Sequence, residues 1–162
     1  MAQPPVVDAS PLIFLSKVDL LDLLKLVGEE VIVPKAVDTE IRQSGTDEIT
    51  VKAVEMTNWL RIVETPSIPE IIRSFGNLGK GESSVLAWAY AHPGTEAILD
   101  DLMARRCAVL IEIPVRGTLG LVLTAKQRGI IPAARPVIEQ LCRSGMYLSE
   151  SVVNQALTLV EE

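Results

Sequence analysis

Residues 6–15 of the chain read VVDASPLIFL. The β-branched dipeptide Val6-Val7 predicts a short strand that ends at Asp8. Ser10-Pro11 then supplies an N-cap residue and a first-turn proline, which together predict a helix through the apolar residues that follow. A strand is therefore expected to pass directly into a helix, with an acidic side chain at the junction.

The same alternation continues along the chain. Residues 20–27 carry apolar side chains at helical spacing, and residues 31–33 and 96–99 are apolar runs typical of buried strands, the second of which ends at Asp100-Asp101. Further strands are expected at residues 61–63 and within 109–115, and further helices at 35–43, 47–60, 82–91, 102–107, 118–128, 134–144 and 149–161, with Ser44-Gly45 between the first two. This order predicts a mostly parallel sheet covered by helices on both faces, with a site beyond the carboxyl ends of its strands.

Size, hydropathy and charge limit the classes of protein to consider. The chain is expected to form one domain, residues 1–162. Its apolar stretches are shorter than the ~20 residues of a membrane span, and its first residues lack the features of a secretory signal, so a cytoplasmic protein is expected. The net charge of −6 counts against non-specific binding of nucleic acid. Divalent cations bound to clustered acids would reverse that field locally.

Several familiar chemistries are excluded by the residues themselves. His92 is the only histidine, which rules out a multi-histidine metal site within one chain. Cys107 and Cys142 lie outside any C-x-x-C spacing and are predicted to be small buried hydrophobic residues. Gly79-Lys80-Gly81 fails as a phosphate loop, because glycine rather than Ser or Thr follows the lysine. Nor does a G-x-G-x-x-G loop follow the first strand.

Four acidic residues stand out by their positions: Asp8 and Asp101 end strands, Glu40 flanks an apolar helical stripe, and Glu82 lies in a first helical turn. Converging carboxylates repel unless a hard cation joins them, and an all-oxygen set favours Mg²⁺ or Mn²⁺ and phosphodiester cleavage. Each has a simpler alternative. Asp8 is then a turn residue, Glu82 a helix-dipole partner, Glu40 a solvated acid, and one of Asp100 and Asp101 a helix cap.

The chain resembles the PIN-like domains, and in particular a prokaryotic branch of predicted nucleic-acid-binding proteins. The resemblance runs from VVDASPLIFLSKVDLLDLL to RSGMYLSESVVNQAL, and its most specific segments are LGKGES, LDDLMARR and RGTLG. It implies a PIN-like three-layer α/β/α sandwich with a central, mostly parallel sheet of four to five strands. The family has an acidic residue at four places, which match Asp8, Glu40, Glu82 and Asp101 here.

The resemblance also implies a function. It points to a Mg²⁺- or Mn²⁺-dependent endoribonuclease in which Asp8, Glu82 and Asp101 bind metal, with Asp100 as an alternative or auxiliary ligand. It further implies the toxin of a type II toxin–antitoxin pair, similar to the VapC toxins, with a small antitoxin protein as partner and a homodimer as assembly. The alternative is a non-catalytic PIN-fold module that binds RNA or a partner protein.

Polar and basic residues in the same segments are candidates for contacts with RNA. Ser10 and Thr118 are predicted to hydrogen-bond a ligand or the scissile phosphate, with helix capping as the alternative. Four basic residues are predicted to contact phosphates, with solvated surface charges as the alternative: Lys80, Arg105, Arg106 and Arg116.

Overall fold

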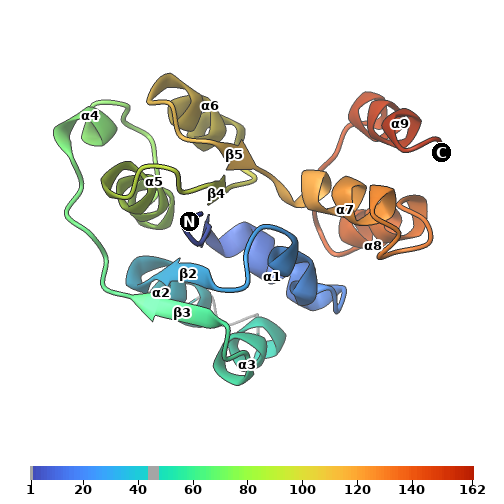
Figure 1. The fold of residues 1–162 in the computed structure, drawn as a ribbon, viewed down its shortest axis with the longest axis horizontal. Coiled ribbons are helices and arrows are strands. Elements are labelled where there is room, and N and C mark those ends of the chain that lie inside the picture. The colour runs from blue at the N-terminus through green and yellow to red at the C-terminus, as the bar shows by residue number, and fades with distance from the viewer. Residues whose placement is uncertain (1, 44–47) are drawn as a thin grey trace.

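Within residues 2–43 and 48–162, which the computed structural model describes, five short strands form one parallel sheet (Figure 1). Their order is β3-β2-β1-β4-β5, and every neighbouring pair is parallel. The strands are β1 Val6–Val7, β2 Val31–Pro34, β3 Leu60–Val63, β4 Ala97–Ile98 and β5 Val115–Arg116. The predicted α/β class, with four to five mostly parallel strands, is confirmed.

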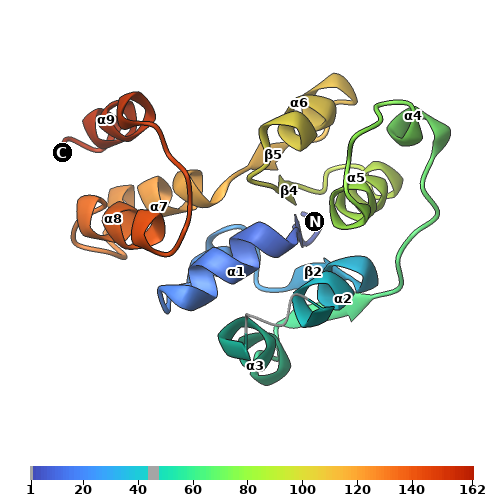
Figure 2. The same cartoon turned by 180° about the vertical axis from the view of Figure 1, so that it is seen from behind.

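Helices flank this sheet and complete the three-layer α/β/α sandwich; α2, for example, lies behind β2 in Figure 1 and in front of it in the reverse view of Figure 2. Every residue of β1, β2 and β4 is buried, as expected for strands covered on both faces. The helices are α1 Ala9–Lys17, the 3₁₀ helix η1 Leu21–Leu26, α2 Lys35–Gln43, α3 Glu48–Met56, α4 Glu70–Arg73, α5 Lys80–Ala91, α6 Leu102–Leu110, α7 Thr118–Gln127, α8 Arg135–Arg143 and α9 Glu150–Leu159.

The start of α1 differs from the prediction. The helix begins at Ala9, and Asp8 rather than Ser10 is the N-cap residue, although its side chain makes no capping hydrogen bond. The hydroxyl of Ser10 is directed away from the backbone of its own helix and donates to Asp100 Oδ2 at 3.0 Å. A tertiary hydrogen bond therefore replaces the local cap that the sequence predicted.

Two other helix ends differ from the prediction. The helix α6 continues through Val109 and Leu110, and of the range 109–115, which was predicted to contain a strand, only Val115 belongs to β5, where it pairs with Ala97. Leu60 belongs to β3, opposite Val31 of β2, so α3 ends at Met56. The expected start of that helix at Asp47 and the Ser44-Gly45 break lie outside the described residues. Among the cysteines, Cys107 is buried but Cys142 is exposed, contrary to the prediction for the latter.

The helices next to the carboxyl ends of the strands are anchored in the core. Leu12 and Leu15 of α1 are fully buried, as are Val85 and Leu86 of α5. Burial of an aliphatic side chain contributes about 1.5–3 kcal/mol, which makes a shift of either helix costly. The first turns of α1 and α5 are thus held in fixed positions at the edge of the sheet.

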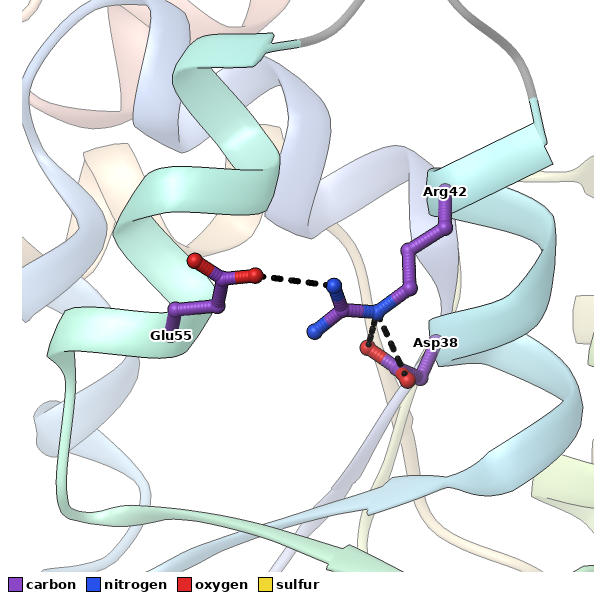
Figure 3. A network of polar contacts seen from close by, with 3 residues as sticks. All are labelled: Asp38, Arg42 and Glu55. Atoms are coloured by element: carbon purple, nitrogen blue, oxygen red, sulfur yellow. Dashed lines mark hydrogen bonds and ion pairs between the residues drawn. The ribbon is translucent and has the colours of Figure 1, made fainter.

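A polar network fixes α2 against α3 (Figure 3). Arg42 Nε donates to both carboxylate oxygens of Asp38, at 3.1 and 3.0 Å, and Arg42 Nη1 donates to Glu55 Oε1 at 2.9 Å. Asp38 is buried, so the guanidinium supplies the opposite charge that a buried carboxylate requires. Glu40 lies on the same helix, between Asp38 and Arg42 in sequence. The network therefore also restrains the backbone of Glu40.

The topology brings the ends of β1 and β4 together. Val6 pairs with Ala97 and Val7 with Ile98, and the backbone N–H of Asp8 donates to the carbonyl of Ile98 at 3.1 Å. The acidic residues that follow the two strands consequently lie at the same edge of the sheet. In the part of the chain that the structure describes, no helix is long and apolar enough to cross a membrane.

Candidate active site

A pocket of about 590 Å³ lies where β1 and β4 end. All five predicted acidic residues line it, together with Ser10 and Arg105; the acids are Asp8, Glu40, Glu82, Asp100 and Asp101. They come from the ends of two strands, the first turn of α5 and the middle of α2, which are distant from one another in sequence. The parallel topology therefore gathers the carboxylates that the sequence singled out.

Asp8 is the least hydrated of these acids. Its side chain is buried, and among the described residues Oδ1 has no hydrogen-bond partner. Burial, aided by the charges of Glu82, Glu40 and Asp100, raises the pKa of Asp8 to about 7, although the N–H of Ala9 opposes the shift. A buried carboxylate with an unpaired oxygen is stable only with a proton or a cation bound to it.

Gly81 allows two carboxylates to approach the same point in the first turn of α5. A Cβ atom at this position would lie 2.9 Å from Glu40 Oε1 and 3.1 Å from Asp8 Oδ1, closer than such contacts normally occur. Glu40 is exposed to solvent but directs this oxygen at the backbone of Gly81. From the sequence, Gly81 was considered as part of a failed phosphate loop and was given no part in the site.

Glu82 both caps α5 and lines the pocket. Its Oε1 accepts a hydrogen bond from the N–H of Gly79, the N-cap residue, at 2.9 Å. Partial burial, followed by the charges of Asp101 and Glu40, raises the pKa of Glu82, whereas the Gly79 N–H lowers it. Glu82 therefore stabilises the start of its helix, as the simpler alternative predicted, and also lines the pocket.

Asp100 and Asp101 make different contacts. Asp100 accepts hydrogen bonds from Ser10 Oγ at 3.0 Å, Thr118 N at 2.7 Å and Thr118 Oγ1 at 2.8 Å, and so links α1, β4 and α7. Asp101 is the N-cap of α6, where Oδ2 accepts from Ala104 N at 2.9 Å. The sequence left open which of the two aspartates caps a helix. Asp101 caps α6, whereas Asp100 accepts hydrogen bonds from Ser10 and Thr118.

The predicted RNA-contacting residues divide into two groups. Ser10 and Arg105 line the pocket. Thr118 and Arg116 are not part of the lining: Thr118 is fully buried and donates to Asp100, and Arg116 Nε donates to Glu96 Oε1 at 2.8 Å. Lys80 lines an adjoining groove of about 540 Å³ that shares Glu40 with the pocket. Arg106 is exposed on α6 and is not part of the pocket lining.

Part of the pocket lining is apolar, and sequence reasoning missed it. It is formed by side chains of α1, α7 and the C-terminal segment: Phe14, Leu119, Met146, Tyr147, Leu148 and Val152. The contact of α9 with α7 brings residues 146–152 to this position. No local pattern near the C-terminus indicates this, because the contact joins segments that are far apart in the chain.

The donors present fit a hard divalent cation. They are all oxygens, one of them is buried and unpaired on Asp8, and Gly81 leaves space where a side chain would separate Asp8 from Glu40. Within residues 2–43 and 48–162, no three His, Cys, Asp or Glu side chains stand so that they could hold an ion together. Glu82, Asp100 and Asp101 instead direct carboxylate oxygens at protein donors. Side-chain rotation of Glu82 and Asp101 would be required to complete a metal site.

Gly81→Ala is expected to weaken Mn²⁺ binding by roughly tenfold while preserving the fold, since disturbing a metal ligand's surroundings costs 10–100-fold in affinity. The added methyl group displaces Glu40, which is free to move into solvent, but also crowds the buried Asp8 oxygen. Isothermal titration with MnCl₂ measures the change. Gly120→Ala is the matched control, because its Cβ would meet only Arg116 Cγ at 3.4 Å. Equal affinities in the two variants would show that Gly81 has no part in a metal site.

Comparison with known proteins adds a family to this geometry. A family model described as a PIN domain matches residues 4–162. The match extends from the first strand to the last helix and includes all the residues that line the carboxylate pocket. No curated protein matches the chain significantly.

Proposed function

The chain belongs to the PIN domain family, and from this premise we propose that it is a divalent-metal-dependent endoribonuclease with the carboxylate pocket as its catalytic centre. PIN domains are generally nucleases that use divalent metals. The observation that carries the proposal is the buried, unpaired oxygen of Asp8, which lies with Glu40 around Gly81 at the carboxyl end of the sheet. An uncompensated carboxylate of this kind is costly to folding and is typical of functional sites.

In this proposal Asp8, Glu82 and Asp101 hold Mg²⁺ or Mn²⁺, with Asp100 as auxiliary, and the bound metal supplies an activated water and neutralises charge on the phosphate. Glu40 lies at the open edge of the pocket, where it accepts a proton from the attacking water. Asp100 fixes the positions of Ser10 and Thr118 through three hydrogen bonds. Arg105 and Lys80 supply positive charge for phosphates on the two sides of the centre.

The test is cleavage of a mixed-sequence RNA in Mn²⁺, repeated in excess EDTA. We expect cleavage that EDTA abolishes and that renewed Mn²⁺ restores. Glu40→Gln should lower the rate by roughly a hundredfold, the lower end of the range that a general base contributes. Glu29→Gln, at an exposed acid outside the pocket, is the preparation control for contaminating nuclease. Equal cleavage by both variants would contradict the assignment.

A non-catalytic module that binds RNA or a protein is the second candidate, and one observation favours it. Glu82, Asp100 and Asp101 already accept hydrogen bonds from protein donors, so these carboxylates have structural roles that do not require metal. A module of this kind need not bind Mn²⁺. Calorimetric silence at millimolar Mn²⁺, together with RNA that remains intact, would favour it over the nuclease.

We further propose that the protein is the toxin of a type II toxin–antitoxin pair, acts as a homodimer and is inhibited by a small antitoxin protein. The resemblance of LGKGES and LDDLMARR to the family supports this role. The surface of α6 is suited to a protein partner, because it exposes Leu102, Met103, Val109 and Leu110. Growth arrest on induced expression, relieved by Asp8→Asn, would support the role, and sedimentation velocity measures the assembly.

A further inference from the structure

Tyr147 is the most exposed large hydrophobic side chain of the described residues, at 89%. It lies at the rim of the carboxylate pocket, whose lining it shares with Asp8 and Glu82. The other tyrosine, Tyr90 of α5, is half as exposed and is not part of this lining. An aromatic ring that is exposed to solvent beside a cluster of acids does not contribute to the core, and it is available to contact a ligand in the pocket.

The backbone on each side of Tyr147 is held in place. Gly145 has a φ of +109°, a conformation that favours glycine, and turns the chain after α8. Met146 is buried and anchors the segment, and the hydroxyl of Ser149 caps α9 two residues after Tyr147. The ring therefore projects into solvent from an anchored stretch of backbone.

The pocket lining is partly charged and partly apolar, as a nucleotide is. It combines the carboxylates and Arg105 with Tyr147, Leu148 and Val152. A nucleotide whose phosphate is bound at the carboxylates, where the metal of the proposed function would supply positive charge, therefore has apolar side chains in the same pocket for its nucleoside. The flat face of a base is the part of a nucleotide that matches an exposed aromatic ring.

From this arrangement we infer that Tyr147 stacks on a nucleobase of the RNA strand bound at the carboxylate centre. The inference rests on the proposed nuclease function, which it extends by a substrate-binding residue. Stacking requires an unpaired base, so the strand is single-stranded where it meets Tyr147. It also tolerates any base, because every base has a π face.

The experiment measures binding of a short fluorescein-labelled single-stranded RNA by anisotropy in Mn²⁺, in the Glu40→Gln background, which keeps the proposed metal ligands, with intact RNA verified on a gel. Tyr147→Ala should weaken binding by roughly tenfold, the typical effect of removing one stacked aromatic ring. Tyr147→Phe should retain the affinity, because the ring remains. Tyr90→Ala, the matched control, should bind as tightly as the parent protein.

A second arm identifies the contact as a stacked base. RNAs that each lack one base are compared, and one position should weaken binding to the Tyr147 protein but not to Tyr147→Ala. Additive losses at every position, or unchanged affinity of Tyr147→Ala, would overturn the inference and leave the ring as a protein-contact surface. Equal binding of a fully paired RNA duplex would also overturn it.

Assays of Asp8→Asn and Tyr147→Ala distinguish failure of this inference from failure of the proposed function. If Asp8→Asn still cleaves RNA in Mn²⁺, the assignment of the catalytic centre fails, whatever the stacking result. If cleavage is lost in Asp8→Asn but Tyr147→Ala binds and cleaves like the wild type, the function stands and the stacking inference fails.

Discussion

Asp8→Asn is expected to lower the rate of Mn²⁺-dependent RNA cleavage by at least about a hundredfold. Loss of a hydrogen-bond partner to a metal ligand already costs 10–100-fold, and loss of the ligand's own charge should exceed the upper end of that range. Asn has nearly the same shape as Asp, so the change removes the charge on the buried, unpaired oxygen without leaving a cavity. The assay is single-turnover cleavage of a labelled RNA at saturating protein.

Asp38→Asn is the matched control, since Asp38 is the other buried aspartate of the described residues. It is paired with Arg42 and lies outside the pocket lining, so cleavage should be retained. The two substitutions should also have opposite effects on stability without metal. Asp38→Asn weakens a buried ion pair, whereas Asp8→Asn removes an uncompensated buried charge. Undiminished cleavage by Asp8→Asn would show that the catalytic centre lies elsewhere.

The part of the site that follows from strand ends could be predicted from the sequence. Asp8 and the Asp100-Asp101 pair come directly after apolar runs, and parallel strands place such residues at one edge. Glu82 could be predicted to lie in the first turn of a helix, because a glycine-rich loop precedes that helix. The metal, the substrate and the roles of individual acids stay predictions, since no contact in the structure tests them.

The remaining details depend on contacts between distant segments. Serine is a common N-cap residue, but the hydroxyl of Ser10 donates to Asp100 instead of capping its helix. Arg116 lies in the RGTLG segment, yet the pairing of β5 with β4 places it beside Glu96. Tyr147 gives no periodic signal, because a single exposed aromatic becomes meaningful only when α9 packs against α7. Local patterns place the acidic residues after their strands, but do not show which distant residues those side chains contact.

In the absence of divalent metal, the free energy of unfolding is expected to fall as the pH rises from about 4 to about 7. Burial raises the pKa of Asp8 from 3.8 to about 7, so the folded protein retains a proton that the unfolded chain has released in this window. Stability declines with pH wherever the folded state binds more protons, and the total loss from this group is at most about 4 kcal/mol. Denaturant unfolding at a series of pH values in EDTA measures it.

Two other acids with shifted pKa values, Glu82 and Glu162, also affect the dependence of stability on pH. Glu82 also has a raised pKa and adds to the decline as it ionises. Glu162 has a lowered pKa because its carboxylate accepts from the N–H groups of Ala134 and Arg135, so its contribution is lost only as the pH falls below the ordinary glutamate range. The slope from about pH 5 to about pH 7 therefore reports on Asp8 and Glu82 together, and Asp8→Asn separates their contributions.

Two comparisons decide whether Asp8 causes the decline. Asp8→Asn should remove most of the slope and make the metal-free protein more stable than the wild type at neutral pH, because a neutral amide replaces a charge that burial disfavours. Mn²⁺ should restore the stability of the wild type at neutral pH, with a shift that grows with metal concentration, and should have little effect on Asp8→Asn. A slope that persists unchanged in Asp8→Asn would contradict the raised pKa of this residue. A stabilisation by Mn²⁺ that is equal in both proteins would place the metal site away from Asp8.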